Sequence, residues 1–218
     1  NLGSASILMA TKTKILFVFL FLFALEMQAQ NVVIGATTGT TSNYLYGPLY
    51  RSSAGSSFNY SKYQYLYTAT ELGIPNGAMI TGIEWLKYSA GTVTGANNTF
   101  GIWLKNSSAS TLTLGTTWDN VINGATQVFN STTYDVTGAA GTWIGNTSMS
   151  YTYTGGNLEI ATDWVKTGTA SASVPFYVNT ATGMAIGAAS NAALTGTSTL
   201  SNTLYADNRP TIRITYTL

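Results

Sequence analysis

The chain of 218 residues contains no cysteine and no histidine. Without histidine it has no Ser-His-Asp or Cys-His arrangement and no imidazole metal ligand. Without cysteine it has no disulfides and no thiolate chemistry, so an exported chain of this size must bury enough apolar surface to fold without cross-links. An exported protein without disulfides fits a bacterial route better than a eukaryotic one.

Charge is also scarce, with 9 basic and 8 acidic residues in the whole chain. Lys12, Lys14 and Glu26 belong to an N-terminal segment, so the rest carries seven residues of each sign and a formal net charge of zero. Such a chain has no basic field to attract nucleic acid or anionic lipid, and a near-neutral surface favours association. The chain is nevertheless 45% hydrophobic and 12% aromatic, which is typical of a folded protein.

Residues 9–29 have the pattern of a cleavable signal peptide. Met9 is followed by Lys12 and Lys14, an apolar run over 15–25 and a polar stretch that ends at Ala29. The apolar run is shorter than the roughly 20 residues that span a bilayer. We predict export by the Sec route, cleavage after Ala29, a secreted or cell-surface location on a bacterium and no membrane span afterwards. An uncleaved anchor is the alternative, and residues 1–8 are interpreted as upstream sequence.

Beyond residue 30, apolar and polar residues alternate, and clusters of Gly, Asn and Ser interrupt them. This pattern predicts many short strands and no helix. The clearest strands are expected at 80–88, 99–106, 157–164 and 211–218, and weaker ones at 31–38, 128–136, 150–154, 174–178 and 183–188. Loops are expected at 88–98, 136–146 and 189–202. Strands with one apolar face need a second layer, so we predict an all-β antiparallel β-sandwich of jelly-roll type, as a single domain over 30–218.

The alternation also predicts which side chains share a face. Three expected faces are Phe100, Ile102 and Leu104 opposite Trp103 and Lys105; Leu158, Ile160 and Trp164 opposite Glu159 and Asp163; and Ile212, Ile214, Tyr216 and Leu218 opposite Thr211, Arg213, Thr215 and Thr217.

Several segments, taken in order, resemble a module of secreted and surface proteins of Bacteroidota. They are NYSKYQYLYTATELG (59–73), GAMITGIEWLKY (77–88), FGIWLKNSSASTL (100–112) and the segments 126–143, 148–162 and 208–216. The module's most recognisable piece, Y-x-G-x-x-N-L-x-I, is present in shortened form at 153–160. The resemblance implies an extracellular jelly-roll β-sandwich. Such modules often occur with a type IX secretion sorting domain, which this sequence does not include, and they bring no catalytic motif.

Carboxylates are the remaining candidates for catalysis and metal binding. A glycosidase needs two carboxyl groups about 5–10 Å apart. Glu159 and Asp163 share a strand face, but four residues separate them by roughly 13 Å. We interpret them as solvated charges on an exposed face and predict that the protein is not an enzyme and has no catalytic residues.

Cofactors are not expected either. The glycine-rich segment 35–43 lacks the spacing of a phosphate-binding loop. Asp119-Asn120 and Asp207-Asn208 suggest calcium, yet turn residues are the simpler interpretation. We predict no metal-binding residues and no cofactor, with structural calcium left open.

Aromatic residues remain as contact candidates, because flat rings stack on sugars and on other rings. The candidates are Tyr63, Tyr65 and Tyr67, which alternate with Gln64 and Leu66, together with Tyr44, Tyr46 and Trp103. The resembling module carries an apolar residue at the position of Leu66, which favours Leu66 inward and the tyrosines outward. Half-buried packing of the tyrosines is the alternative.

Two functions follow. We predict a secreted, non-enzymatic β-sandwich that acts through its surface as a structural or adhesive subunit and self-associates into a fibre, coat or matrix. The alternative is a carbohydrate-binding module of the cell surface, with a surface glycan as its partner. Neither function involves nucleic acid.

Overall fold

The structure is a computed structural model that describes residues 28–38, 47–49, 58–95, 97–201 and 207–218. Its elements are β1 (Gln30–Ile34), β2 (Tyr60–Tyr67), α2 (Ala69–Leu72), β3 (Met79–Leu86), β4 (Val93–Thr94), β5 (Thr99–Ser107), β6 (Thr116–Thr117), α3 (Trp118–Ile122), β7 (Thr126–Ser131), β8 (Trp143–Asn146), β9 (Tyr151–Thr152), β10 (Asn157–Val165), β11 (Thr169–Ala170), β12 (Val178–Thr180), β13 (Ala185–Ser190), β14 (Thr199–Leu200), β15 (Asn208–Pro210) and β16 (Ile212–Thr217). The all-β prediction is therefore confirmed. The predicted signal peptide lies outside the described residues except for its last two, and it stays a prediction.

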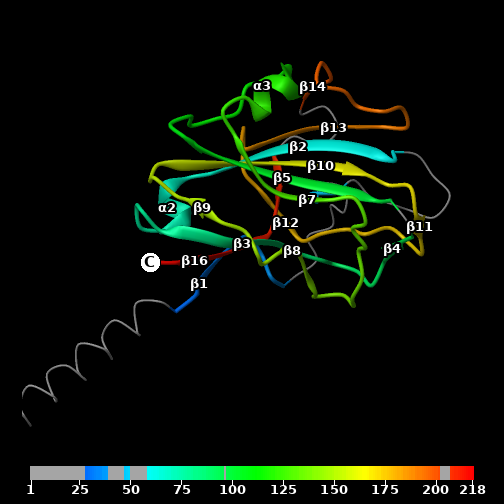
Figure 1. Ribbon diagram of the computed structural model, residues 1–218, viewed down its shortest axis with the longest axis horizontal. Coiled ribbons are helices and arrows are strands. Elements are labelled where there is room, and N and C mark those ends of the chain that lie inside the picture. The colour runs from blue at the N-terminus through cyan, green and yellow to red at the C-terminus, as the bar shows by residue number, and fades with distance from the viewer. Residues whose placement is uncertain (1–27, 39–46, 50–57, 96, 202–206) are drawn as a thin grey trace, which may run out of the picture.

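Two five-stranded antiparallel sheets make up most of the fold. The first sheet has the order β1-β16-β3-β8, with β9 also paired to β3, and the second has the order β13-β2-β10-β5-β7. Figure 1 shows them as two layers, with α3 and β14 on the far side of the second sheet. Three further two-stranded ladders are formed by β11-β4, β12-β15 and β14-β6.

The main core lies between the two sheets. Ile83 and Trp85 of β3 and Ile214 of β16 belong to the same buried cluster as Phe100 and Trp164 of the second sheet. The rings of Trp85 and Phe100 meet edge to face, with centroids 6.1 Å apart. Because each sheet buries one face against the other, the arrangement is that of a β-sandwich.

Strand alternation predicted the inward faces correctly. The apolar residues expected on one face of 99–106, 157–164 and 211–218 belong to the core between the sheets, apart from Leu218. Leu218 lies beyond the end of β16 and is 58% exposed. The expected loops are only partly irregular, because they contain β4, β8 and β14.

The two short helices contradict the prediction that the chain has none. Helix α2 begins with a capping box, in which Glu71 N donates to Thr68 Oγ1 and Thr68 N donates to Glu71 Oε2. It ends at Gly73, whose left-handed φ of 58° suits glycine. Helices of four or five residues are too short to show a 3.6-residue apolar period, so hydrophobic patterning missed them.

A buried arginine connects α2 to the second sheet. Arg209 of β15 is 1% exposed and donates to Leu66 O at 2.6 Å and to Glu71 Oε2 at 3.1 Å. Its guanidinium carbon also lies 4.4 Å from the centroid of the Tyr67 ring. The hydrogen bond from Arg209, together with those from Thr68, lowers the pKa of Glu71 from 4.5 to about 2.

This shift predicts an acid-dependent loss of stability. The pKa of Glu71 is lower in the folded chain, so its stabilisation is complete above about pH 4.5 and is lost as the pH falls toward 2. We expect Glu71→Gln to lower the free energy of unfolding at neutral pH and to reduce its decline between pH 4.5 and 2. Urea unfolding of both proteins across this range measures the effect, and parallel pH profiles would contradict it.

Candidate functional site

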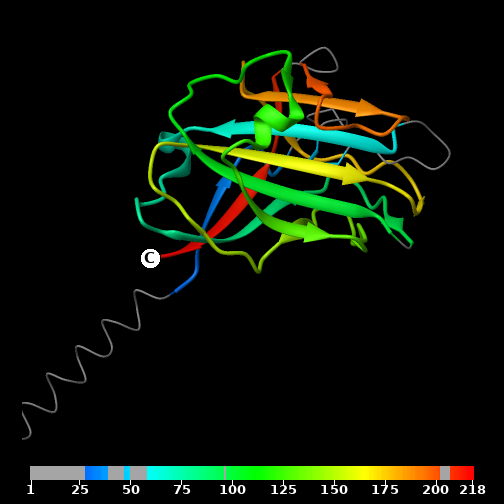
Figure 2. The same ribbon diagram turned by 45° about the horizontal axis from the view of Figure 1, so that its top comes forward.

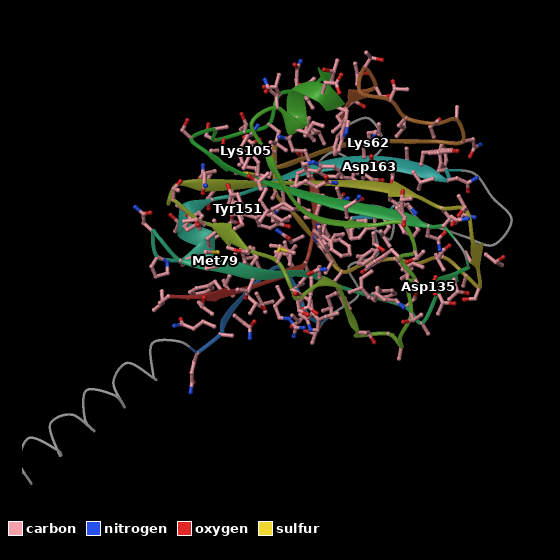
Figure 3. All side chains as sticks on the ribbon, viewed as in Figure 1. Lys62, Met79, Lys105, Asp135, Tyr151 and Asp163 are labelled. Carbon is pink, nitrogen blue, oxygen red and sulfur yellow. The ribbon has the colours of Figure 1, made fainter. Side chains whose placement is uncertain are left out.

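The charged side chains of β2, β10 and β5 lie on the outer face of the second sheet, which points away from the first sheet. Asp163 of β10 lies opposite Lys62 of β2 and forms an ion pair with it (Figure 3). Glu159 of β10 lies opposite Lys105 of β5, with 2.8 Å between Lys105 Nζ and Glu159 Oε2. Each acid of β10 is thereby paired with a different neighbouring strand.

A cap made of residues 112–122 and 195–200 covers part of this outer face. Strands β6 and β14 pair within the cap, and α3 follows β6. Figure 2 shows α3 in front of the strands of the second sheet. A second apolar cluster joins the cap to the sheet; it contains Leu66, Leu112, Trp118, Val121, Ala161, Ile186 and Leu200.

The cap also contacts the charged row. Lys62 Nζ lies 4.5 Å from the centroid of the Trp118 ring, and the Lys62 residue is only 4% exposed. Glu159 is 8% exposed. The interpretation of Glu159 as a solvated charge is therefore wrong, because the residue is buried and pairs with Lys105. Asp163 pairs with Lys62 but its side chain remains 29% exposed.

A cavity of about 180 Å³ remains between the cap and the sheet. Its lining residues are Gln64, Lys105, Ala109, Thr111, Leu112, Thr113, Thr116, Asn120, Val121 and Glu159. Most of them have polar side chains, and they come from the neighbouring strands β2, β10 and β5, from β6 and the segment before it, and from α3. The cavity is thus lined by residues that are far apart in the sequence.

Among the side chains that line the cavity, Glu159 is held by hydrogen bonds and an ion pair from three other residues. Its Oε2 accepts from Gln64 Nε2 at 2.7 Å as well as from Lys105, and its Oε1 accepts from Ser107 Oγ at 2.6 Å. Three protein donors therefore fix the carboxylate in place. A carboxylate has about four lone-pair sites, so Oε1 retains capacity to accept from a ligand.

The prediction that the β2 tyrosines face outward is wrong. Tyr63, Tyr65 and Tyr67 are 3%, 0% and 0% exposed and belong to the core between the sheets. The outward residue is Leu66, which packs in the second cluster beneath the cap. Both faces of β2 are covered, and its polar residues Lys62 and Gln64 take the outer face, where they have charged partners.

The tyrosine hydroxyls connect β2 to neighbouring segments. Tyr65 donates to Gly47 O at 2.9 Å, and Tyr67 donates to Pro210 O at 3.2 Å. Burial is the main cause that raises the pKa of both hydroxyls. These side chains hold the fold together and present no contact surface.

The other aromatic candidates have different positions. Tyr44 and Tyr46 lie outside the described residues. Trp103 faces away from Phe100, Ile102 and Leu104, as alternation predicted, but it is half-buried because it packs edge to face on Trp118 with centroids 5.4 Å apart. Trp103 therefore supports the cap beside the cavity.

The described residues contain no group of three or more Asp or Glu side chains that could hold a metal ion. Asp207 has a left-handed φ of 71°, and its Oδ1 accepts from Gly183 N at 2.7 Å. Asp119 lies in the first turn of α3 and is exposed. Asp207 thus acts as a turn residue here, while the predictions on cofactors and catalysis stay untested.

The outermost strands of both sheets lack charge. They are β1 (QNVVI) and β8 (WIGN) in the first sheet and β13 (AIGAAS) and β7 (TQVFNS) in the second, and none contains a charged residue or proline. Within the described residues, no strand pairs with the far edge of β1 or β7. Natural sheets often protect such edges with lysine or proline, and that protection is missing here.

No protein-family model and no curated protein matches the chain. The resemblance to the Bacteroidota module therefore stays a prediction. Neither helix of the described residues has the length and apolar content needed to cross a membrane.

The ion pair between the buried Lys62 of β2 and Asp163 of β10 generates a prediction about stability. We expect Lys62→Met to lower the free energy of unfolding by about 1–3 kcal/mol, because it keeps the stem of the side chain but removes the ammonium from Asp163 and Trp118. Lys166→Met, at a half-exposed lysine that follows β10, is the control and should change stability by less than about 0.5 kcal/mol. Equal losses in the two variants, measured by urea unfolding, would contradict a special role for Lys62.

Proposed function

We propose that this protein is an exported, non-enzymatic β-sandwich of jelly-roll type that acts as a structural or adhesive subunit outside a bacterial cell and associates with its own copies edge to edge. The observation that carries the proposal is the lack of charge and proline in the edge strands β1 and β7. An unprotected edge offers a row of backbone N–H and C=O groups to another strand.

The strand order supports the jelly-roll part of the proposal. With β1, β2, β3, β5, β7, β8, β10 and β16 numbered 1 to 8 in chain order, the sheets read 1-8-3-6 and 2-7-4-5. This order supports a jelly roll with β13 added at one edge. The same architecture is implied by the resemblance to the secreted Bacteroidota module.

The placement of charge supports self-association. The three ion pairs within the sheets, Lys62–Asp163, Lys105–Glu159 and Arg213–Glu84, all lie on inner strands. Two approaching edges therefore meet without like-charge repulsion. A contact between two different edges repeats from copy to copy into a fibre, whereas a contact of one edge with itself forms a dimer.

Strand β1 has a further feature of a contact surface. Val33 is 44% exposed, one of three large hydrophobic residues exposed in the described part of the chain. An exposed valine on an uncharged edge adds apolar burial to backbone pairing.

The non-enzymatic part of the proposal rests on the acids of β10, because Glu159 and Asp163 are each paired with a lysine.

The proposal predicts that a charge on β1 weakens assembly. We expect the purified protein to form oligomers or fibres at high concentration, and Val33→Lys to weaken the association at least about tenfold, because lysine protects an edge by charge. Light scattering and negative-stain electron microscopy measure both. Leu114→Lys is the matched control, since Leu114 is 54% exposed but lies in the cap. A wild-type protein that stays monomeric at high concentration would refute the proposal.

A further inference from the structure

The cavity beneath the cap lies apart from the β1 edge and offers a different kind of surface. It is built on the outer face of the second sheet, whereas β1 belongs to the first sheet. An inference about the cavity therefore does not rest on edge-to-edge association.

Polar residues line the cavity on the sheet side and on the cap side. Gln64, Lys105 and Glu159 lie on the adjacent strands β2, β5 and β10 and form its sheet side. On the cap side, the polar residues Thr113, Thr116 and Asn120 line the cavity. A ligand in this space meets donors and acceptors on both sides.

The pairing of charges selects the class of ligand. Lys105 Nζ and Glu159 Oε2 lie 2.8 Å apart and neutralise each other, so the cavity carries no net charge from this pair. A neutral pair gives no net electrostatic attraction for an ion, so charge does not favour an ionic ligand here. A neutral ligand can instead donate a hydroxyl proton to Glu159 Oε1 and accept from a second N–H of Lys105, because an ammonium has three N–H donors.

Adjacent hydroxyl groups on one ring have this combination of donor and acceptor. Leu112 and Val121, which also line the cavity, supply apolar contact for the C–H groups of such a ring. A volume of about 180 Å³ equals roughly six water molecules at about 30 Å³ each. This is the scale of one sugar ring and is below the usual range of drug-sized pockets.

We propose that the cavity between the cap and the second sheet binds a single neutral sugar unit through adjacent hydroxyl groups. Lys105 and Glu159 contact the hydroxyls from the sheet side, and Asn120 contacts the ring from α3. The sugar is either a free monosaccharide or an accessible unit of a glycan, since both present the same hydroxyl groups.

Calorimetric titration of the full protein with glucose, galactose, mannose and N-acetylglucosamine tests this proposal. We expect at least one sugar to bind in the millimolar range or tighter, and glycine, as a small zwitterion, not to bind. Asn120→Ala and Lys105→Met should each weaken the binding at least tenfold. Asn120 is exposed, so its variant is expected to fold normally even if Lys105→Met reduces stability.

Controls separate this proposal from self-association. Lys166→Met and Val33→Lys should leave sugar binding unchanged, and Asn120→Ala should leave oligomer size unchanged. A glycan array then distinguishes the source, since binding to immobilised glycans indicates a surface glycan and binding to the free sugar alone indicates a monosaccharide. The proposal is overturned if no sugar of the panel binds, if glycine binds instead, or if Asn120→Ala, with its fold verified by circular dichroism, binds as tightly as the wild type.

Discussion

The alternation of strand β10 is the constraint on which the rest of the structure depends. Its residues Leu158, Ile160 and Trp164 enter the core between the sheets, while Glu159 and Asp163 face outward. Each acid lies opposite a lysine on a different neighbouring strand. If β2 or β5 shifted by one residue relative to β10, charged side chains would turn into the core and an ion pair would separate. Strand β10 therefore holds both neighbouring strands in register.

This use of charge explains how a chain with so few charged residues specifies a large sheet structure. Lys62, Lys105, Glu159 and Asp163 are all used on inner strands of the second sheet, and Arg213 and Glu84 form the equivalent pair in the first. None of the remaining charged residues lies on an edge strand of either large sheet. The edge strands β1 and β7 contain Thr, Ser, Asn, Gln and apolar residues, which keep their backbone groups accessible to a partner strand.

Much of the sandwich was predictable from local sequence. The four clearest strands were predicted within about two residues of their bounds, because their alternation is regular.

The orientation of strand β2 was predicted wrongly because both of its faces are covered. Tyrosines alternate there with Leu66, and a resemblance decided the direction wrongly. Lys62 and Gln64 share the face of Leu66, and those polar residues were the signal that this face points away from the core. Likewise, Thr68 and Glu71 have the spacing of a capping box, followed by Gly73, so α2 could have been found.

The cavity could not have been predicted in this way. Gln64, Lys105, Asn120 and Glu159 are distant in the sequence and meet only because the cap folds over the second sheet. Local patterns carry no information on such a meeting.

The two proposed surfaces differ in what controls them. Pairing at an edge uses backbone groups that every residue except proline supplies, so most substitutions on β1 leave it intact, and only a charge or a proline blocks it. Binding in the proposed cavity site depends on particular side chains, so the loss of one amide or ammonium group weakens it. A chain of this kind can therefore change its ligand by substitutions in the cap while its mode of assembly persists. The cap is well placed for this, because it is held by its own apolar cluster and contributes nothing to the core between the sheets.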